Sequence, residues 1–217
     1  MINNTYTKNF LLNDQSLVKR SHVINHLINK YSYQKYLEIG IFDGFTFKNV
    51  DCELKHGVDP GAEGVVSPLV THRMTSDDFF SQTTEKYDLI FIDGLHYHQQ
   101  VIKDINNALE HINTGGYILL HDCNPCDELS QKVPRESVVW NGDVWKALVL
   151  FRKQNPNAEC FVLDTDFGIG VIQYDENIKP ITLLDTLDIS YIDFEKQKKE
   201  LLNLTECNSY EVLSCMI

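Results

Sequence analysis

Two short stretches of this chain combine carboxylate and imidazole side chains. The first is Asp93-Gly-Leu-His96, and the second is His121-Asp122. A histidine with an ordinary pKa of about 6.5 can remove a proton at neutral pH. Two carboxylates that lie together can share a hard divalent cation and leave positions open for the hydroxyls of a substrate. These residues predict proton transfer, metal binding or both.

Each stretch follows an apolar run that is typical of a buried strand. Residues 87–92 end at Asp93, and residues 117–120 end at His121. Other strands are expected at 36–41, 54–58 and 72–75, with a hairpin at 161–163 and 170–173. Helices are expected at 16–31, 98–112 and 194–204, a turn at 113–116, and a loop followed by a helix at 136–154. Strands that alternate with helices predict an α/β fold with a doubly wound, mostly parallel sheet and an antiparallel C-terminal hairpin.

The length of 217 residues fits one domain. Within it we expect an N-terminal helical cap (1–35), a core (36–175) that includes a substrate loop (123–145), and a C-terminal extension (176–217). The extension carries apolar residues on a short helix. It could dock on its own sheet or on another subunit of a homo-oligomer.

The composition excludes several classes of partner. The net charge is −12, and no run of lysine and arginine occurs, so we expect no binding to nucleic acid and none to an anionic membrane surface. No apolar stretch is long enough to span a membrane. The N-terminus is polar and unlike a signal peptide, and the six cysteines are irregularly spaced. We therefore expect reduced thiols and a cytoplasmic protein.

The stretch from Tyr36 to Gly44 indicates a cofactor. It carries Glu38 beside Gly40 and Gly44, and glycines at a strand-to-helix turn let the backbone approach a ligand closely. The carboxylate of Glu38 would repel a phosphate, but it suits a nucleoside cofactor with a cationic amino-acid end. Asp59 follows 21 residues after Glu38, where an acidic residue can bind ribose hydroxyls.

An NAD site is the alternative, but it would show G-x-G-x-x-G rather than the G-x-x-x-G found here. The pattern favours S-adenosylmethionine (SAM). The group Thr75-Ser-Asp-Asp78 offers Ser76 and Asp77 for the adenine amino group, although the same residues could cap a helix.

Together these motifs resemble the class I SAM-dependent methyltransferases. Within that class the chain resembles the small family that includes macrolide-sugar O-methyltransferases and the cephalosporin-hydroxylase-like proteins. The matching pieces are YLEIGIFDG (36–44), GVDP (57–60), FIDGLHY (91–97) and NTGGYILLHD (113–122). The resemblance implies a Rossmann-like fold, SAM as methyl donor, and a hydroxyl of a sugar or other small polar acceptor as the methylated group.

The same resemblance assigns roles to residues. It implies that Asp93 joins Glu38, Gly40, Gly44, Asp59, Ser76 and Asp77 at the cofactor, that His96 is the general base, and that magnesium is held by Asp93 and the pair His121-Asp122. A glutamate is common where this chain has His121, and imidazole favours manganese or another transition metal over magnesium. Without a metal, His121 is the rival base to His96.

Two features near the second motif have more ordinary explanations. Cys123 and Cys126 lack a second ligand pair for zinc, so we expect structural thiols. Trp140 and Trp145 flank an Asn-Gly-Asp sequence. We expect Trp145 to pack beneath a helix and the loop before it to face the substrate. The functional alternatives are an N- or phosphate-directed methyltransferase and a noncatalytic SAM-binding module.

Overall fold

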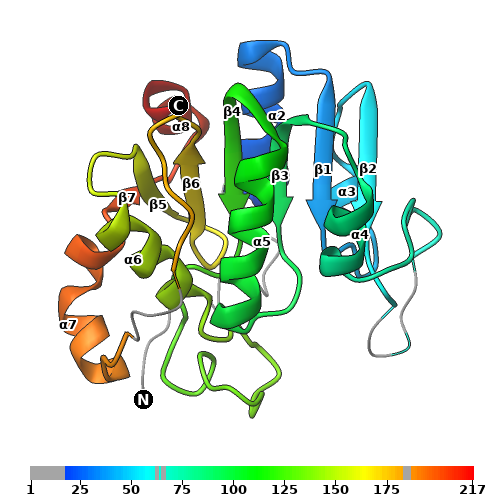
Figure 1. Ribbon diagram of the computed structural model, residues 1–217. Coiled ribbons are helices and arrows are strands. Elements are labelled where there is room, and N and C mark those ends of the chain that lie inside the picture. The colour runs from blue at the N-terminus through cyan, green and yellow to red at the C-terminus, as the bar shows by residue number, and fades with distance from the viewer. Residues whose placement is uncertain (1–17, 62–63, 65–66, 183–186) are drawn as a thin grey trace.

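The computed structural model describes residues 18–61, 64, 67–182 and 187–217. Its centre is a seven-stranded sheet in the order β2-β1-β3-β4-β6-β5-β7 (Figure 1). The strands are β1 (Lys35–Ile39), β2 (Leu54–Val58), β3 (Tyr87–Ile92), β4 (Ile112–Leu120), β5 (Cys160–Asp164), β6 (Ile169–Gln173) and β7 (Leu204–Glu206). Strands β1 to β4 pair in parallel, whereas β6 is antiparallel to both β4 and β5. The expected fold class and hairpin are confirmed.

Helices cover both faces of the sheet. They are α2 (Arg20–Tyr31), α3 (Phe45–Lys48), α4 (Ser76–Gln82), α5 (His98–His111), α6 (Val144–Gln154), α7 (Tyr191–Leu201) and α8 (Tyr210–Met216). Alternate residues of each strand point to opposite faces, so Leu37 packs with α5 and α6 while Tyr36 packs with α2. Figure 1 shows α5 in front of β3 and β4, and α2 behind the sheet.

Two sequence predictions were wrong. The strand expected at 72–75 is reduced to a single bridge between Val58 and His72. The chain leaves the sheet there because the Thr75 side chain accepts a hydrogen bond from the Asp78 N–H (3.1 Å) and so caps α4. The turn expected at 113–116 is part of β4, which begins at Ile112. Ile112 pairs with Tyr87 and Tyr117 with Leu89, so residues 113–116 form a bulge opposite Asp88, and the left-handed φ of Gly115 (79°) allows it.

The ends of the chain differ in detail from expectation. The first helix begins at Arg20, and residues 16 and 17 of the expected range lie outside the described residues. The helix expected at 194–204 is α7, which ends at Leu201, and the sequence indicated neither β7 nor α8. Leu213 and Ile217 pack in the same core as α2, so the C-terminal segment docks on its own sheet. No helix of the described residues is long and apolar enough to cross a membrane.

Candidate active site

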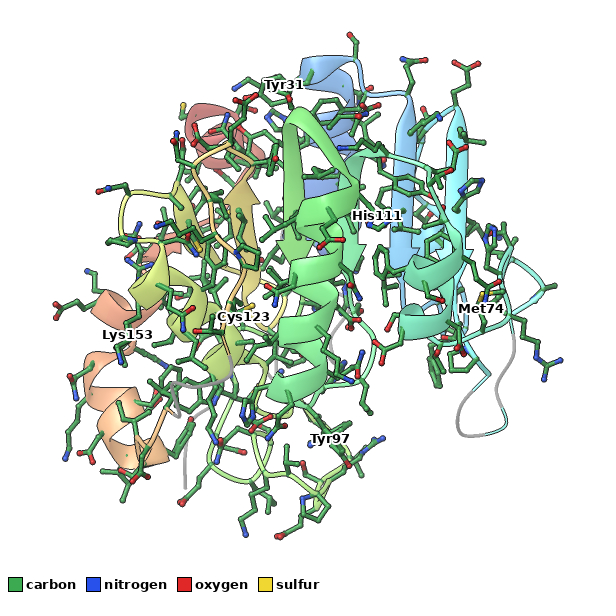
Figure 2. All side chains as sticks on the ribbon, in the orientation of Figure 1. Tyr31, Met74, Tyr97, His111, Cys123 and Lys153 are labelled. Atoms are coloured by element: carbon green, nitrogen blue, oxygen red, sulfur yellow. The ribbon has the colours of Figure 1, made fainter. Side chains whose placement is uncertain are left out.

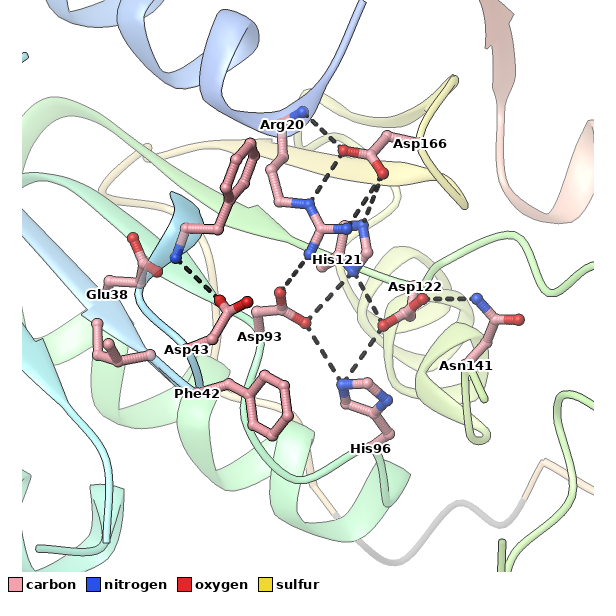
Figure 3. A network of polar contacts seen from close by, with 12 residues as sticks. Arg20, Glu38, Phe42, Asp43, Asp93, His96, His121, Asp122, Asn141 and Asp166 are labelled. Carbon is pink, nitrogen blue, oxygen red and sulfur yellow. Dashed lines mark hydrogen bonds and ion pairs between the residues drawn. The ribbon is translucent and has the colours of Figure 1, made fainter. Parts of the chain in front are cut away.

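The two carboxylate–imidazole motifs meet at the carboxyl edge of the sheet. Asp93 directly follows β3, His121 and Asp122 directly follow β4, and the final residues of these neighbouring strands, Ile92 and Leu120, are paired. His96 lies in the short connection from β3 to α5. This edge lies at the bottom of Figure 2, where Tyr97 marks the start of α5, and Figure 3 shows the four side chains pointing toward one another. The sequence prediction that they converge is confirmed.

His96 presents one nitrogen to the carboxylates and anchors the other. Its Nδ1 lies 3.1 Å from the carbonyl oxygen of Trp140 and donates to it. Its Nε2 lies 3.4 Å from Asp93 Oδ1 and 3.3 Å from Asp122 Oδ2. In the neutral ring this Nε2 carries a lone pair, which therefore faces two carboxylate oxygens that also carry lone pairs. The arrangement needs a positive charge, either a proton on Nε2 or a cation between the three atoms.

His121 is placed differently. It is 3% exposed, and its Nδ1 lies 2.9 Å from Asp122 Oδ2, which is an ordinary hydrogen-bond length. The same nitrogen lies 3.3 Å from Asp93 Oδ1, and Nε2 lies 3.5 Å from Asp166 Oδ1. His121 thus contacts three carboxylates and holds Asp122 in place.

Three further residues complete the polar network, and none of them was recognised from the sequence. Arg20 Nη1 donates to Asp93 Oδ2 at 2.7 Å, and the other edge of its guanidinium pairs with Asp166. Asn141 Nδ2 donates to Asp122 Oδ1 at 2.5 Å. Arg20 and Asp166 are 146 residues apart, so only the fold brings them together. The sequence contains no local signal for this pairing.

The charges of the cluster shift its titration. Burial alone would lower the pKa of His96, but Asp122 and Asp93 raise it above its ordinary value. Burial and Arg20 act against the charged form of His121, yet Asp122 and Asp93 hold its pKa well above the usual range. Burial would raise the pKa of Asp93, but His121 and Arg20 hold it well below the usual range. The carboxylates therefore attract cations strongly.

The donor atoms of Asp93, His96 and Asp122 form a group that could hold a metal ion. They lie within 4.8 Å of one another, and this is the one such group of three or more ligands among the described residues. Metal–ligand bonds of about 2.0–2.2 Å place neighbouring ligand atoms about 3.0–3.6 Å apart. The separations of 3.3 and 3.4 Å from His96 Nε2 fit that range. The group contains His96 where the sequence predicted His121 as the third ligand.

A proton on His96 would account less well for these separations. Hydrogen bonds between an imidazolium and a carboxylate are about 2.7–2.9 Å long, as His121 and Asp122 show. His96 Nε2 is farther than that from both carboxylates. The geometry favours a ligand role for His96 and a hydrogen-bonding role for His121.

Residues 140–143, which we call the anchoring segment, connect the site to α6. The ring of Trp140 stacks on that of His96 with centroids 5.1 Å apart, and Asp143 N–H donates to the carbonyl of His96. A side chain on Gly142 would lie 2.0 Å from the same carbonyl, so the close approach requires glycine. Trp145 is fully buried and stacks on Phe194, which confirms that it packs beneath a helix.

The predicted cofactor loop lies beside Asp93. Gly40 has a φ of 89°, and a Cβ there would lie 2.0 Å from the backbone oxygen of Asp93. Asp59 accepts hydrogen bonds from the N–H groups of Ile41 and Phe42 on Oδ2 and of Gly61 on Oδ1. A carboxylate has about four acceptor positions, so Asp59 supports the loop and keeps capacity for one further donor.

Glu38 is less available than the sequence suggested. It is 1% exposed and accepts a hydrogen bond from the hydroxyl of Tyr36, which lies on the same face of β1. Burial raises its pKa to about 8. Gly44, with a φ of 84°, packs against Ser67. The roles of these residues toward a cofactor stay predictions.

The predicted adenine contacts lie at the start of α4. Ser76 Oγ and Asp77 Oδ1 accept hydrogen bonds from Gln100 of α5, and Asp77 Oδ2 pairs with Lys103. Thr75 is the residue that caps the helix. Ser76 and Asp77 are thus tied to α5, and their contact with adenine also stays a prediction.

Comparisons with known proteins agree with this architecture. Residues 48–123 match the family model of a methyltransferase domain. An uncharacterized protein of Acanthamoeba polyphaga mimivirus is 28% identical over 127 residues, which is 46% of this chain, and the match spans 58% of that protein's length.

Solved structures share the fold at low sequence identity. An O-methyltransferase from Bacillus cereus in complex with S-adenosylhomocysteine has a TM-score of 0.50 and 14% identity, covering 79% of this chain and 89% of that one. A methyltransferase from Podospora anserina bound to S-adenosylhomocysteine has a TM-score of 0.52 and 12% identity. The match covers 80% of this chain and 86% of that one. A proposed O-methyltransferase from Klebsiella pneumoniae has a TM-score of 0.52 and 15% identity, covering 72% and 80%. These comparisons show a Rossmann-like methyltransferase fold, with a match to a methyltransferase domain over residues 48–123.

Proposed function

We propose that this protein transfers a methyl group from SAM to a hydroxyl of a sugar or another small polar acceptor, with a divalent cation at Asp93, His96 and Asp122. The convergence of these three donor atoms carries the proposal. In each ligand residue, the other polar atom of the side chain is held by a hydrogen bond. His96 Nδ1 contacts the Trp140 carbonyl, Asp122 Oδ1 contacts Asn141, and Asp93 Oδ2 contacts Arg20. Such outer contacts orient the ligands in metal sites of proteins.

The cofactor is proposed to lie along the carboxyl ends of β1, β2 and β3. Gly40 and Gly44 shape the loop, Asp59 uses its remaining acceptor position for a ribose hydroxyl, and Ser76 and Asp77 lie at the adenine end. Glu38 and Asp93 lie at the amino-acid end. A cationic ammonium group favours the ionised carboxylate, so binding would lower the pKa of Glu38 from about 8.

The cation and the general base compete for one atom. The single lone pair on His96 Nε2 cannot both coordinate a metal and accept a proton. We favour coordination because this atom faces Asp93 and Asp122 at metal-like separations. When bound, a divalent cation lowers the pKa of a coordinated acceptor hydroxyl, which supplies the activation that a base would otherwise give. The nitrogen and two oxygens suit manganese or another transition metal better than magnesium.

The rim of the site supports a sugar-like acceptor. Phe42 is 54% exposed, and Figure 3 shows its ring beside Asp93 and His96. Val138, on the predicted substrate loop, is 90% exposed. An aromatic face next to carboxylates fits a ligand that has both apolar C–H surfaces and hydroxyls.

The test combines binding and turnover. Calorimetry with S-adenosylhomocysteine should show one site per chain, and radiolabelled methyl transfer from SAM should be found on hydroxyl acceptors in a panel of sugars, phenols, amines and phosphates. Transfer should stop on chelation and resume with Mn²⁺. A lack of binding refutes the cofactor assignment, binding without transfer to any acceptor supports a noncatalytic module, and transfer to amines alone refutes the O-directed assignment.

The cellular setting is proposed on separate grounds. Cys52, Cys123, Cys160, Cys207 and Cys215 form no disulfide bond in the structure. Free thiols support residence in the reducing cytoplasm. We retain a single domain over residues 1–217, with 123–145 as the substrate loop.

A further inference from the structure

Arg20 reaches the candidate metal site from the first residue of α2. Its guanidinium uses opposite edges for two carboxylates (Figure 3). Nη1 donates to Asp93 Oδ2 at 2.7 Å, while Nε and Nη2 donate to Asp166 Oδ2 and Oδ1 at 3.0 and 3.1 Å. A planar guanidinium can make this two-sided contact, whereas the ammonium of a lysine cannot.

Asp166 fixes Arg20 as well as neutralising it. Its Oδ2 also accepts the backbone N–H of Arg20 at 2.8 Å. The preceding residue adds a second link between the same segments: the hydroxyl of Thr165 donates a hydrogen bond to the carbonyl of Val18 at 2.5 Å. Asp166 has a left-handed φ of 44°, a conformation that non-glycine residues rarely adopt. The β5–β6 turn and the start of α2 are therefore joined at the guanidinium.

The consequence falls on Asp93. Its Oδ2 is committed to Arg20, so only Oδ1 faces His96. Without Arg20 the carboxylate could rotate and offer both oxygens to a cation. We propose that Arg20 is a positioning residue that presents Asp93 to the metal through one oxygen, and that Asp166 acts by holding Arg20. This inference rests on the proposed metal site.

Simple charge predicts the opposite effect. Arg20 is a cation close to a cation site, so its loss should strengthen metal binding if charge were its only influence. A positioning role predicts that its loss weakens binding, because an outer contact to a ligand typically contributes 10–100-fold in metal affinity. The direction of the change therefore distinguishes the two roles.

The test is Mn²⁺ affinity, measured from the electron paramagnetic resonance of free Mn²⁺ without substrate. Arg20→Gln should weaken binding about 10-fold or more. Arg20→Lys keeps the charge and loses the two-sided contact, and it should bind between wild type and Arg20→Gln. Asp166→Asn leaves Arg20 in place but loosens it, and should also weaken binding. Lys35→Gln, which breaks an exposed ion pair with Glu85 at the far end of β1, is the matched control and should bind as wild type.

Folding and function are read separately. Circular dichroism fixes a temperature at which each variant is folded, and calorimetry with S-adenosylhomocysteine reports the cofactor site. Tighter or unchanged Mn²⁺ binding by folded Arg20→Gln and Asp166→Asn overturns the inference while leaving the proposed function intact. If wild type binds S-adenosylhomocysteine but no Mn²⁺, the metal assignment and this inference both fail, and the methyltransferase proposal stands.

Discussion

The side-chain amide of Asn141 lies 2.5 Å from Asp122 Oδ1 and donates a hydrogen bond to it. Asp122, the second residue after β4, has a left-handed φ of 62°. Its Oδ2 is then the oxygen that faces His96 and His121. Asn141 thus determines which oxygen of Asp122 points into the site.

Asn141→Ala should weaken Mn²⁺ binding about 10–100-fold, because the Asp122 carboxylate loses the contact that orients it. The free energy of unfolding should fall by about 1–3 kcal/mol, since a buried carboxylate loses a donor. Asn177→Ala is the matched control, because Asn177 makes the same amide–carboxylate contact with Asp175 at the surface. Equal Mn²⁺ affinities in the two variants would show that Asn141 has no role in the site.

Gly40→Ala should be severely destabilising. Its new Cβ would lie 2.0 Å from the Asp93 backbone oxygen, so β1 and the Asp93 turn must separate. Gly115→Ala is the control: it has a similar φ of 79° but no atom within 4 Å of an added Cβ, so it should cost only the conformational strain of about 1–2 kcal/mol. Urea unfolding measures both. A similar loss for the two variants would contradict the close packing of Gly40.

Glu38 should make stability depend on pH. The folded protein keeps the Glu38 proton up to a pKa of about 8, whereas the unfolded chain loses it near 4.5. Unfolding between these values releases a proton, so this contribution is complete below about pH 4.5 and is lost as the pH rises through about 8. The slope is at most about 1.4 kcal/mol per pH unit. Urea unfolding gives the free energy of unfolding at each pH for wild type and for Glu38→Gln, and the difference between the two curves isolates the contribution of Glu38. Parallel curves from pH 5 to 8 would exclude this contribution.

The two tryptophans should respond differently to truncation. Trp145→Ala should lower the free energy of unfolding by about 3–5 kcal/mol, because a fully buried ring is lost from its stack on Phe194. Trp140→Ala should cost less stability, since the ring is only half-buried, but it should reduce methyl transfer by removing the stack on His96. Denaturation and transfer rates on both variants check this. A reversal of the two effects would contradict the assigned roles.

The sequence predicted those parts of the site that depend on local pattern. Asp93, His121 and Asp122 were placed correctly because each follows a strongly apolar strand, and parallel strands end at one edge. Arg20, Asn141 and Asp166 were missed because they come from other elements and only tertiary packing brings them to the cluster. The hydrogen bond from Tyr36 to Glu38 was missed for a similar reason, since it depends on the two side chains sharing one face of β1.

The errors in the fold have the same origin. The single bridge at His72 in place of a strand reflects competition from the Thr75 cap. The segment around Gly115 belongs to β4 because Ile112 and Tyr117 on either side of its bulge both pair with β3. In both places tertiary pairing or a capping contact outweighed the local propensity.

The central claim is a divalent cation held by Asp93, His96 and Asp122 beside bound SAM. Crystals grown with S-adenosylhomocysteine and Mn²⁺ test it most directly, through anomalous diffraction. The account predicts one anomalous peak about 2.0–2.3 Å from Asp93 Oδ1, His96 Nε2 and Asp122 Oδ2. Bound S-adenosylhomocysteine with no peak at these atoms, or a peak coordinated by His121 instead of His96, would contradict it.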